Sequence, residues 1–179
     1  MRTVPLIAML MVVLSSASTS AWDLSKQAKI PDDQHATAQK AADAFHASHY
    51  DEAVTLYQAI HRAHPDSLYA WSNLGVVLFM QGKSKEARDA FQHAVNLYPN
   101  DFLCLADLGM IDVQLNDLEG AIKNLTAAEK VDPNDAKIHF FLGTAYTQME
   151  RLPEAQQELK KAQELNSRKS PVEITGPML

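Results

Sequence analysis

The sequence predicts an all-α protein, a helical-repeat solenoid of four 34-residue helix-turn-helix units. Three observations predict this fold. One phrase recurs every 34 residues, as HPDSLYAWSNLG at 64–75, YPNDFLCLADLG at 98–109 and DPNDAKIHFFLG at 132–143. Small residues recur at two fixed positions of the same period, and proline recurs at a third. A period of this length indicates one supersecondary unit that is repeated and stacked.

The first element, residues 1–21, is predicted to be an export signal. Arg2 gives it a positive start, Val4 to Leu14 form an apolar stretch, and small residues precede an expected cut before Trp22. The apolar stretch is shorter than the roughly 20 residues that span a bilayer. We therefore expect a periplasmic or secreted protein with no stable membrane span after cleavage. The alternative is an uncleaved N-terminal anchor.

The repeats begin at Gln34. Cut every 34 residues from this position, the chain divides into four segments that align without an insertion. The last ten residues contain proline and glycine without a helical period, which is typical of irregular structure. The predicted organisation is a signal peptide at 1–21, an N-terminal lead-in at 22–33, repeats at 34–67, 68–101, 102–135 and 136–169, and an irregular tail at 170–179.

Each segment is predicted to form two antiparallel helices. Small residues at positions 8 and 20 allow the two backbones to approach closely, and a bulky residue at position 24 fills the space beside that contact. Proline at position 32 ends the second helix because it lacks an amide hydrogen. Position 8 holds Ala41, Gly75, Gly109 and Gly143, position 20 holds Ala53, Ala87, Ala121 and Ala155, and position 32 holds Pro65, Pro99, Pro133 and Ser167.

Helix caps are expected just after each proline. Asp33, Ser67, Asp101 and Asp135 stand 34 residues apart, and each has an oxygen that can accept from the free amides of the next helix. The final helix is expected to close the stack with its own polar outer face. Its core-facing residues are predicted to be Ala155, Leu159 and Ala162.

These residues resemble the tetratricopeptide repeat family, and the resemblance covers 34–169. The resemblance implies a right-handed solenoid that binds proteins or peptides, with the first helices lining a concave groove. Asp112 departs from the family, which usually has an aromatic residue there. The residues that carry the resemblance best are the WSNLG motif at 71–75 with Ala87, Phe91, Ala94 and Pro99.

Composition argues against nucleic acid as a partner. Without Arg2, the mature chain has 15 basic and 22 acidic side chains, a formal charge of −7, and no cluster of Lys and Arg that would suit a phosphate backbone. Cys104 is the only cysteine, so the chain has no internal disulfide. A buried or partly buried free thiol is the expected state of Cys104.

No catalytic, cofactor or metal motif is present in the sequence. Patterns of the HExxH, GxSxG and CxxCH kinds are absent, and no glycine-rich loop could hold a phosphate. His46 and His49, like His61 and His64, are three residues apart, but a catalytic zinc site needs three protein ligands. We expect solvated surface histidines, no cofactor, and no enzyme.

A partner site is predicted from the resemblance, which implies that positions 2, 5, 6, 9, 12 and 13 of the first helices face a ligand. These positions are mainly apolar. Ala38 and Ala42 replace the Lys and Asn with which some family members hold a C-terminal carboxylate, so that activity is not expected. The alternative is that several of these residues belong to the core between repeats, or that the chain's own tail covers them. The predicted partner-binding residues are Phe45, Tyr69, Asn73, Val76, Phe79, Met80, Leu103, Asp107, Met110, Lys137, Phe140 and Phe141.

The predicted function is that of an exported scaffold or adaptor that binds a protein or peptide, in envelope assembly or secretion. Asp107 stands between apolar Leu103 and Met110, where a carboxylate can accept charge-assisted hydrogen bonds from a bound segment. Its alternative is an internal partner, Asn73 or Lys137. Two other functions stay open, a self-associating structural protein that forms a homo-oligomer and, less favoured, a metal-dependent enzyme.

Overall fold

The computed structural model describes residues 32–169, so the predicted signal, most of the lead-in and the tail lie outside the described part. A short 3-10 turn, η2 (Asp32–Gln34), precedes eight α-helices. The described residues contain no strand. The helices are α2 (His35–His46), α3 (Tyr50–Ala63), α4 (Leu68–Met80), α5 (Ser84–Leu97), α6 (Phe102–Gln114), α7 (Leu118–Val131), α8 (Ala136–Gln148) and α9 (Leu152–Lys169).

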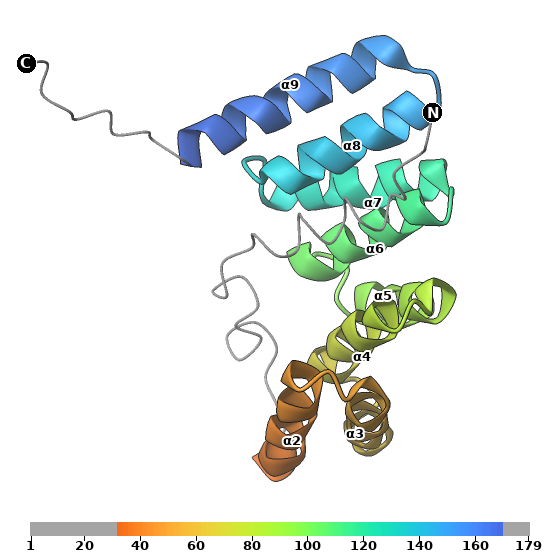
Figure 1. The fold of residues 1–179 in the computed structure, drawn as a ribbon, viewed down its shortest axis with the longest axis vertical. Coiled ribbons are helices and arrows are strands. Elements are labelled where there is room, and N and C mark those ends of the chain that lie inside the picture. Colours follow the sequence, from red (N-terminus) through yellow and green to blue (C-terminus); the bar gives the residue numbers. More distant parts are fainter. Residues whose placement is uncertain (1–31, 170–179) are drawn as a thin grey trace, which may run out of the picture.

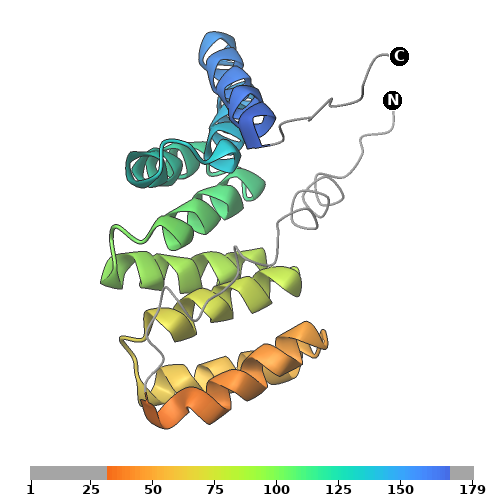
Figure 2. The ribbon, with the colours of Figure 1, turned by 90° about the vertical axis from the view of Figure 1, so that its left-hand side faces the viewer.

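Each predicted 34-residue segment holds one antiparallel helix pair. The pairs stack in chain order from α2 and α3 at one end to α8 and α9 at the other, and the helix axes turn along the stack (Figures 1 and 2). Each helix packs mainly on the helices before and after it in the sequence, and α6 also contacts α8. The predicted all-α repeat of four helix pairs is confirmed.

In the second, third and fourth repeats, the close approach of the paired helices depends on glycine at position 8. A Cβ atom at Gly109 would lie 2.5 Å from Cγ of Leu125, and one at Gly75 would lie 2.7 Å from the Phe91 ring. Contacts this short do not occur between real side chains, so a larger residue would force the helices apart. The prediction that a bulky residue at position 24 fills the space beside position 8 is confirmed for these repeats.

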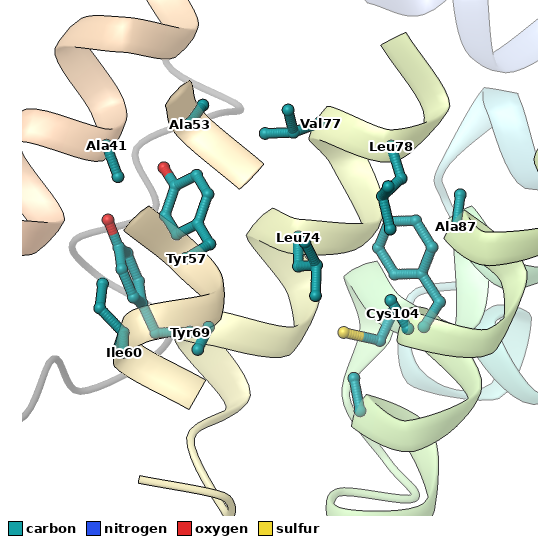
Figure 3. Packing of buried hydrophobic residues seen from close by; sticks show 14 of the residues in the cluster. Ala41, Ala53, Tyr57, Ile60, Tyr69, Leu74, Val77, Leu78, Ala87 and Cys104 are labelled. Carbon is teal, nitrogen blue, oxygen red and sulfur yellow. The ribbon is translucent and has the colours of Figure 1, made fainter. Parts of the chain in front are cut away.

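The buried apolar side chains form two clusters that meet at α6. The N-terminal cluster runs from α2 to α6 and includes Tyr57, Leu74 and Phe91 (Figure 3 shows most of this packing). The C-terminal cluster runs from α6 to α8 and includes Leu125 and Leu142. Helix α6 supplies residues to both clusters, so it joins the two halves of the stack.

The prolines end the second helices as predicted, and the one missing proline has a visible effect. Helices α3, α5 and α7 each end two residues before a proline. Helix α9 has Ser167 at the equivalent position and continues to Lys169. Because serine keeps its amide hydrogen and does not clash with the preceding turn, nothing stops the helix there.

Three of the four predicted caps are confirmed. Ser67 accepts from the Ala70 amide at 3.2 Å, Asp101 caps α6, and Asp135 caps α8. The prediction for Asp33 was wrong, because Gln34 is the N-cap residue of α2 and makes no side-chain cap. The Asp33 carboxylate instead lies 3.0 Å from Nε2 of His64.

The prediction of which residues of the last helix face the core was wrong at one residue, Leu159. Ala155 and Ala162 are buried as expected, but Leu159 is 38% exposed. One side of Leu159 packs on Gly143, and no further helix pair in the described part covers its other side. Leu165 is buried in addition.

A charge network around a buried carboxylate explains the unusual aspartate of the third repeat. Asp112 is 1% exposed, and its carboxylate accepts from Nε of Arg88 at 2.6 Å and from the side-chain amide of Asn124 at 2.8 Å. The same guanidinium donates to Asp117, which also accepts from the Gly120 amide. The network connects α5, α6 and α7, and so links the second repeat to the third.

The turn inside each repeat requires a left-handed backbone. The residue at position 15 has a positive φ in all four repeats, and only one of these residues is glycine. Non-glycine residues are strained in this region because Cβ approaches the following carbonyl oxygen. The four residues are Ser48 (φ 61°), Gly82 (φ 76°), Asn116 (φ 62°) and Glu150 (φ 59°).

Candidate functional site

The predicted partner-binding residues all lie on the first helix of a repeat, and we call their common side the first-helix face. Nine of the twelve are at least partly exposed in the structure. Within α6, Leu103, Asp107 and Met110 are spaced by four and three residues, which places them on one side of the helix. The nine accessible residues are Phe45, Val76, Phe79, Met80, Leu103, Asp107, Met110, Lys137 and Phe140.

The other three predicted residues are buried and are not open to a partner in this structure. Tyr69 and Phe141 belong to the two apolar clusters, and Tyr69 packs its ring edge-on against Tyr57. Asn73 is 2% exposed, and its amide donates to the Tyr69 carbonyl within α4 at 2.7 Å. Sequence alone could not separate these residues from their accessible neighbours, because core and face positions alternate within the same helical turns.

The accessible residues give the first-helix face a mainly apolar character. Phe45, Val76 and Phe79 each cover the N-terminal cluster with one side and reach solvent with the other. Met110 and Phe140 do the same over the C-terminal cluster. Half-buried aromatic and methionine side chains can pack against a partner without a large rearrangement of the core.

Asp107 is the distinctive polar group of this face. It is half-buried, and no described residue forms a hydrogen bond or an ion pair with its carboxylate. Burial against the surrounding helices raises the pKa of Asp107 to about 7, although the charge of Lys137 lowers it and the charge of Asp101 raises it further. The carboxylate thus keeps some access to water but lacks the hydrogen bonds that would stabilise its charge.

Neither internal partner considered for Asp107 binds it in the structure. The Asn73 amide is occupied by the Tyr69 carbonyl. Lys137 acts on Asp107 through its charge but forms no ion pair with it within 4 Å. Asp107 therefore remains free to accept hydrogen bonds from a bound segment.

Cys104 is a packing residue and not a reactive group. The thiol is free and 1% exposed within the N-terminal cluster (Figure 3). Burial raises the pKa of the Cys104 thiol, so the reactive thiolate is disfavoured. The expected buried thiol is confirmed.

The histidine pairs chosen from the sequence are not brought together as metal ligands in the described chain. His46 and His49 are exposed, His64 pairs with Asp33, and half-buried His61 packs its ring at a tilt against Trp71, with 3.9 Å between ring centroids. The expectation that the histidines are solvated was wrong for His139, which belongs to neither pair. His139 is fully buried between two glutamates from neighbouring helices, and no spacing in the sequence pointed to that cluster.

Matches to family models cover most of the helical region. Descriptions reading tetratricopeptide repeat match residues 39–102 and 136–169, and one reading TPR repeat matches residues 109–149. The chain belongs to the tetratricopeptide repeat family. Within residues 32–169, the helices of this tetratricopeptide repeat (TPR) protein lack the length and apolar character that a membrane span requires.

The curated relatives are proteins much longer than this chain. BBSome complex member BBS4 of Mus musculus is 27% identical over 117 residues, which are 65% of this chain and 22% of the mouse protein. Anaphase-promoting complex subunit 3 of Schizosaccharomyces pombe is 22% identical over 136 residues, and the match covers 20% of its length. The TPR chain thus spans about a fifth of the length of these relatives.

Solved structures share the fold. MamA from Desulfovibrio magneticus RS-1 superposes with a TM-score of 0.73 at 21% identity, over 77% of this chain and 78% of that one. YrrB, described as a TPR protein with an unusual peptide-binding site, superposes with a TM-score of 0.68 at 25% identity, over 75% of this chain and 70% of that one. The MamA likeness shows the fold alone.

Proposed function

We propose that this TPR protein is a non-enzymatic scaffold that binds an extended or helical segment of a partner protein on the first-helix face. The observation that carries the proposal is an unbonded carboxylate, Asp107, between partly exposed apolar side chains. Apolar side chains supply affinity when they are covered, and a charged acceptor fixes the register of the bound segment. The peptide-binding site named for YrrB supports the same use of a similar fold.

The chemistry of the face defines the partner segment. A Lys or Arg side chain placed on Asp107 would satisfy its carboxylate and restore a pKa nearer the ordinary value. Apolar residues on either side of that cation would cover Met110 and Phe140 on one side and Phe79 on the other. The partner is therefore a segment that carries one basic residue among apolar ones.

Panning of a random peptide library against the purified protein tests this proposal. We expect the enriched peptides to combine apolar residues with a Lys or Arg. Asp107→Asn should weaken their binding by roughly 1.5–3 kcal/mol, the scale of a hydrogen bond to a charged group. Met110→Lys should weaken it as well, because it places a second cation on the face. The matched control is Gln92→Lys on the exposed side of α5, which should leave affinity unchanged. Peptides that bind both face variants as tightly as the wild type would refute the proposal.

Self-association is the second candidate function, since a second copy could cover the same apolar side chains. Sedimentation of the protein at low concentration separates the two functions. A stable dimer in which Met110 and Phe79 are protected favours self-association. A monomer that binds the enriched peptides favours the scaffold.

We further propose that the scaffold acts outside the cytoplasm, in envelope assembly or secretion. The support is the three-part signal pattern of residues 1–21 in the sequence. Cell fractionation with N-terminal sequencing should find a periplasmic or secreted chain that begins near Trp22. A full-length chain in the cytosol that begins at Met1 or Arg2 would contradict this proposal.

A further inference from the structure

A fully buried histidine lies where the last three helices meet. His139 of α8 is 0% exposed, and its Nε2 atom lies 3.0 Å from the carbonyl oxygen of Pro133. A carbonyl oxygen only accepts hydrogen bonds, so Nε2 carries a hydrogen and donates it. This bond fixes the ring orientation and directs Nδ1 toward α7 and α9.

Two carboxylates converge on that second ring nitrogen. Nδ1 of His139 lies 2.7 Å from Oε2 of Glu158 on α9 and 3.9 Å from Oε1 of Glu129 on α7. All three potential ligand atoms lie within 4.8 Å of one another. A nitrogen lone pair cannot face a carboxylate oxygen at such a distance without a positive centre between them.

The positive centre can be a proton or a metal ion, and the second carboxylate favours the metal. One proton on Nδ1 needs a single acceptor, which Glu158 provides. A metal ion uses several ligands at once, and Oε1 of Glu129, which Lys161 also contacts, lies close enough to Nδ1 to serve as a second carboxylate ligand. The bond from Nε2 to a backbone carbonyl is also the arrangement that orients metal-binding histidines.

We propose that His139 Nδ1, Glu129 and Glu158 form a binding site for one divalent transition-metal ion of the Zn²⁺ class. One imidazole and two carboxylates suit Zn²⁺, with its ligand distances of about 2.0–2.2 Å, and leave a fourth position for water. Metal binding requires the two glutamate side chains to rotate so that their oxygens reach those distances. Both are partly exposed, at 27% and 16%, so the ion can reach the buried nitrogen from solvent through them.

Lys161 competes with the ion in the metal-free state. Its Nζ lies 3.0 Å from the same Oε1 atom of Glu129 that faces His139. The Lys161 side chain is 42% exposed and can turn into solvent when the ion binds. The bound ion would then join α7, α8 and α9 directly, which would fix the last helix of the stack.

Titration of the chelator-stripped protein with Zn²⁺, in a buffer with excess Mg²⁺, tests the site by calorimetry. We expect one Zn²⁺ per chain and a melting temperature that rises with Zn²⁺. Glu158→Gln and Glu129→Gln keep the side-chain shape, and each should weaken binding by about tenfold or more. The control is His49→Gln, which removes the exposed His49–Glu52 pair and should change nothing.

Lys161→Met provides a result that a purely structural ion pair would not give. Removal of the competing ammonium should tighten Zn²⁺ binding. Unchanged or weaker binding in Lys161→Met would overturn Glu129 as a ligand and with it the three-ligand site. Absence of saturable Zn²⁺ binding, or equal binding by the wild type and Glu158→Gln, would show that the cluster is a protonated histidine paired with glutamate.

Discussion

Arg88 of α5 donates from Nε to Asp112 of α6 over 2.6 Å. Asp112 stands at the position where the resemblance to the family implies an aromatic side chain. Asp112 is 1% exposed, and burial raises its pKa even though Arg88 and Asn124 act to lower it. A buried ion pair of this kind gives little net stability, but the loss of one partner leaves an uncompensated charge. The pair therefore holds the second and third repeats in one fixed arrangement.

Replacement of Arg88 by methionine should lower the free energy of unfolding by about 2–3 kcal/mol at neutral pH. This is below the range for fully buried pairs, because the Arg88 side chain is 39% exposed. The loss should shrink at acidic pH, where Asp112 can become neutral. Urea unfolding of both proteins at two pH values measures the effect. The control is Lys160→Met, which breaks an exposed pair with Glu164 and should change stability by no more than about 0.5 kcal/mol. An equal effect of the two substitutions would contradict the prediction.

Replacement of Asp107 by asparagine should stabilise the protein, but only at higher pH. The carboxyl has an ordinary pKa of 3.8 and a folded-state pKa of about 7. Below pH 3.8 both states are protonated, so Asp107 has no cost. As the pH rises from 3.8 to about 7, the unfolded chain ionises while the folded state keeps its proton, so the folded state loses stability, and above 7 this cost stays constant. Asparagine removes this cost, so Asp107→Asn should gain about 1–2 kcal/mol at pH 8 and nothing at pH 4, less than the full shift gives because the side chain keeps contact with solvent. Equal stability of both proteins at pH 8 would show that the carboxylate is well solvated.

Replacement of Gly109 by alanine should destabilise the third repeat by about 1–2 kcal/mol. Alanine favours the helix by up to about 1 kcal/mol, but its Cβ would meet Leu125, and the clash outweighs the gain. Thermal unfolding measures the loss. In a Leu125→Ala background the same change should cost less, because the contacting atoms are gone. An identical cost in the two backgrounds would locate the strain elsewhere.

The left-handed turns allow a paired test of backbone strain. Glu150→Gly should raise stability by about 0.5–1 kcal/mol, because glycine adopts a φ of 59° without a Cβ clash. Gly82→Ala should lower it by about 1 kcal/mol. No atom lies within 4 Å of the Cβ position at Gly82, so the loss would come from the backbone alone. Chemical unfolding of the two variants should give opposite signs, and the same sign for both would be inconsistent with strain at position 15.

Local rules account for what the sequence predicted well. Glycine at position 8, alanine at position 20 and the caps at Ser67, Asp101 and Asp135 all act within one helix pair or across three residues. Because these residues recur every 34 positions, one alignment of the repeats predicts all four helix pairs. The sequence also identified the first helix of each repeat. Nine of the twelve predicted partner-binding side chains are at least partly exposed.

Contacts between distant residues account for what the sequence missed. Aspartate is a common helix N-cap, so Asp33 was predicted to be one. Its carboxylate instead pairs with His64, which lies 31 residues later in the sequence. Asp112 stood out as an unusual residue, while its partner Arg88 did not, because no short-range rule joins residues 24 apart. The cluster around His139 draws on three helices, and each of its members looks ordinary in the sequence alone.

The division of the apolar core into two clusters has a consequence for hydrogen exchange. Cys104, Leu108 and Ile111 of α6 belong to the N-terminal cluster, whereas Leu105 and Val113 belong to the C-terminal one. Each half of the stack can therefore open as a cooperative unit of its own, and the amides of α6 exchange last because both units must open to free them. A partner that lies along α2 and α4 alone would slow exchange in the first unit only. The pattern of protected amides would then show where along the stack the bound segment ends.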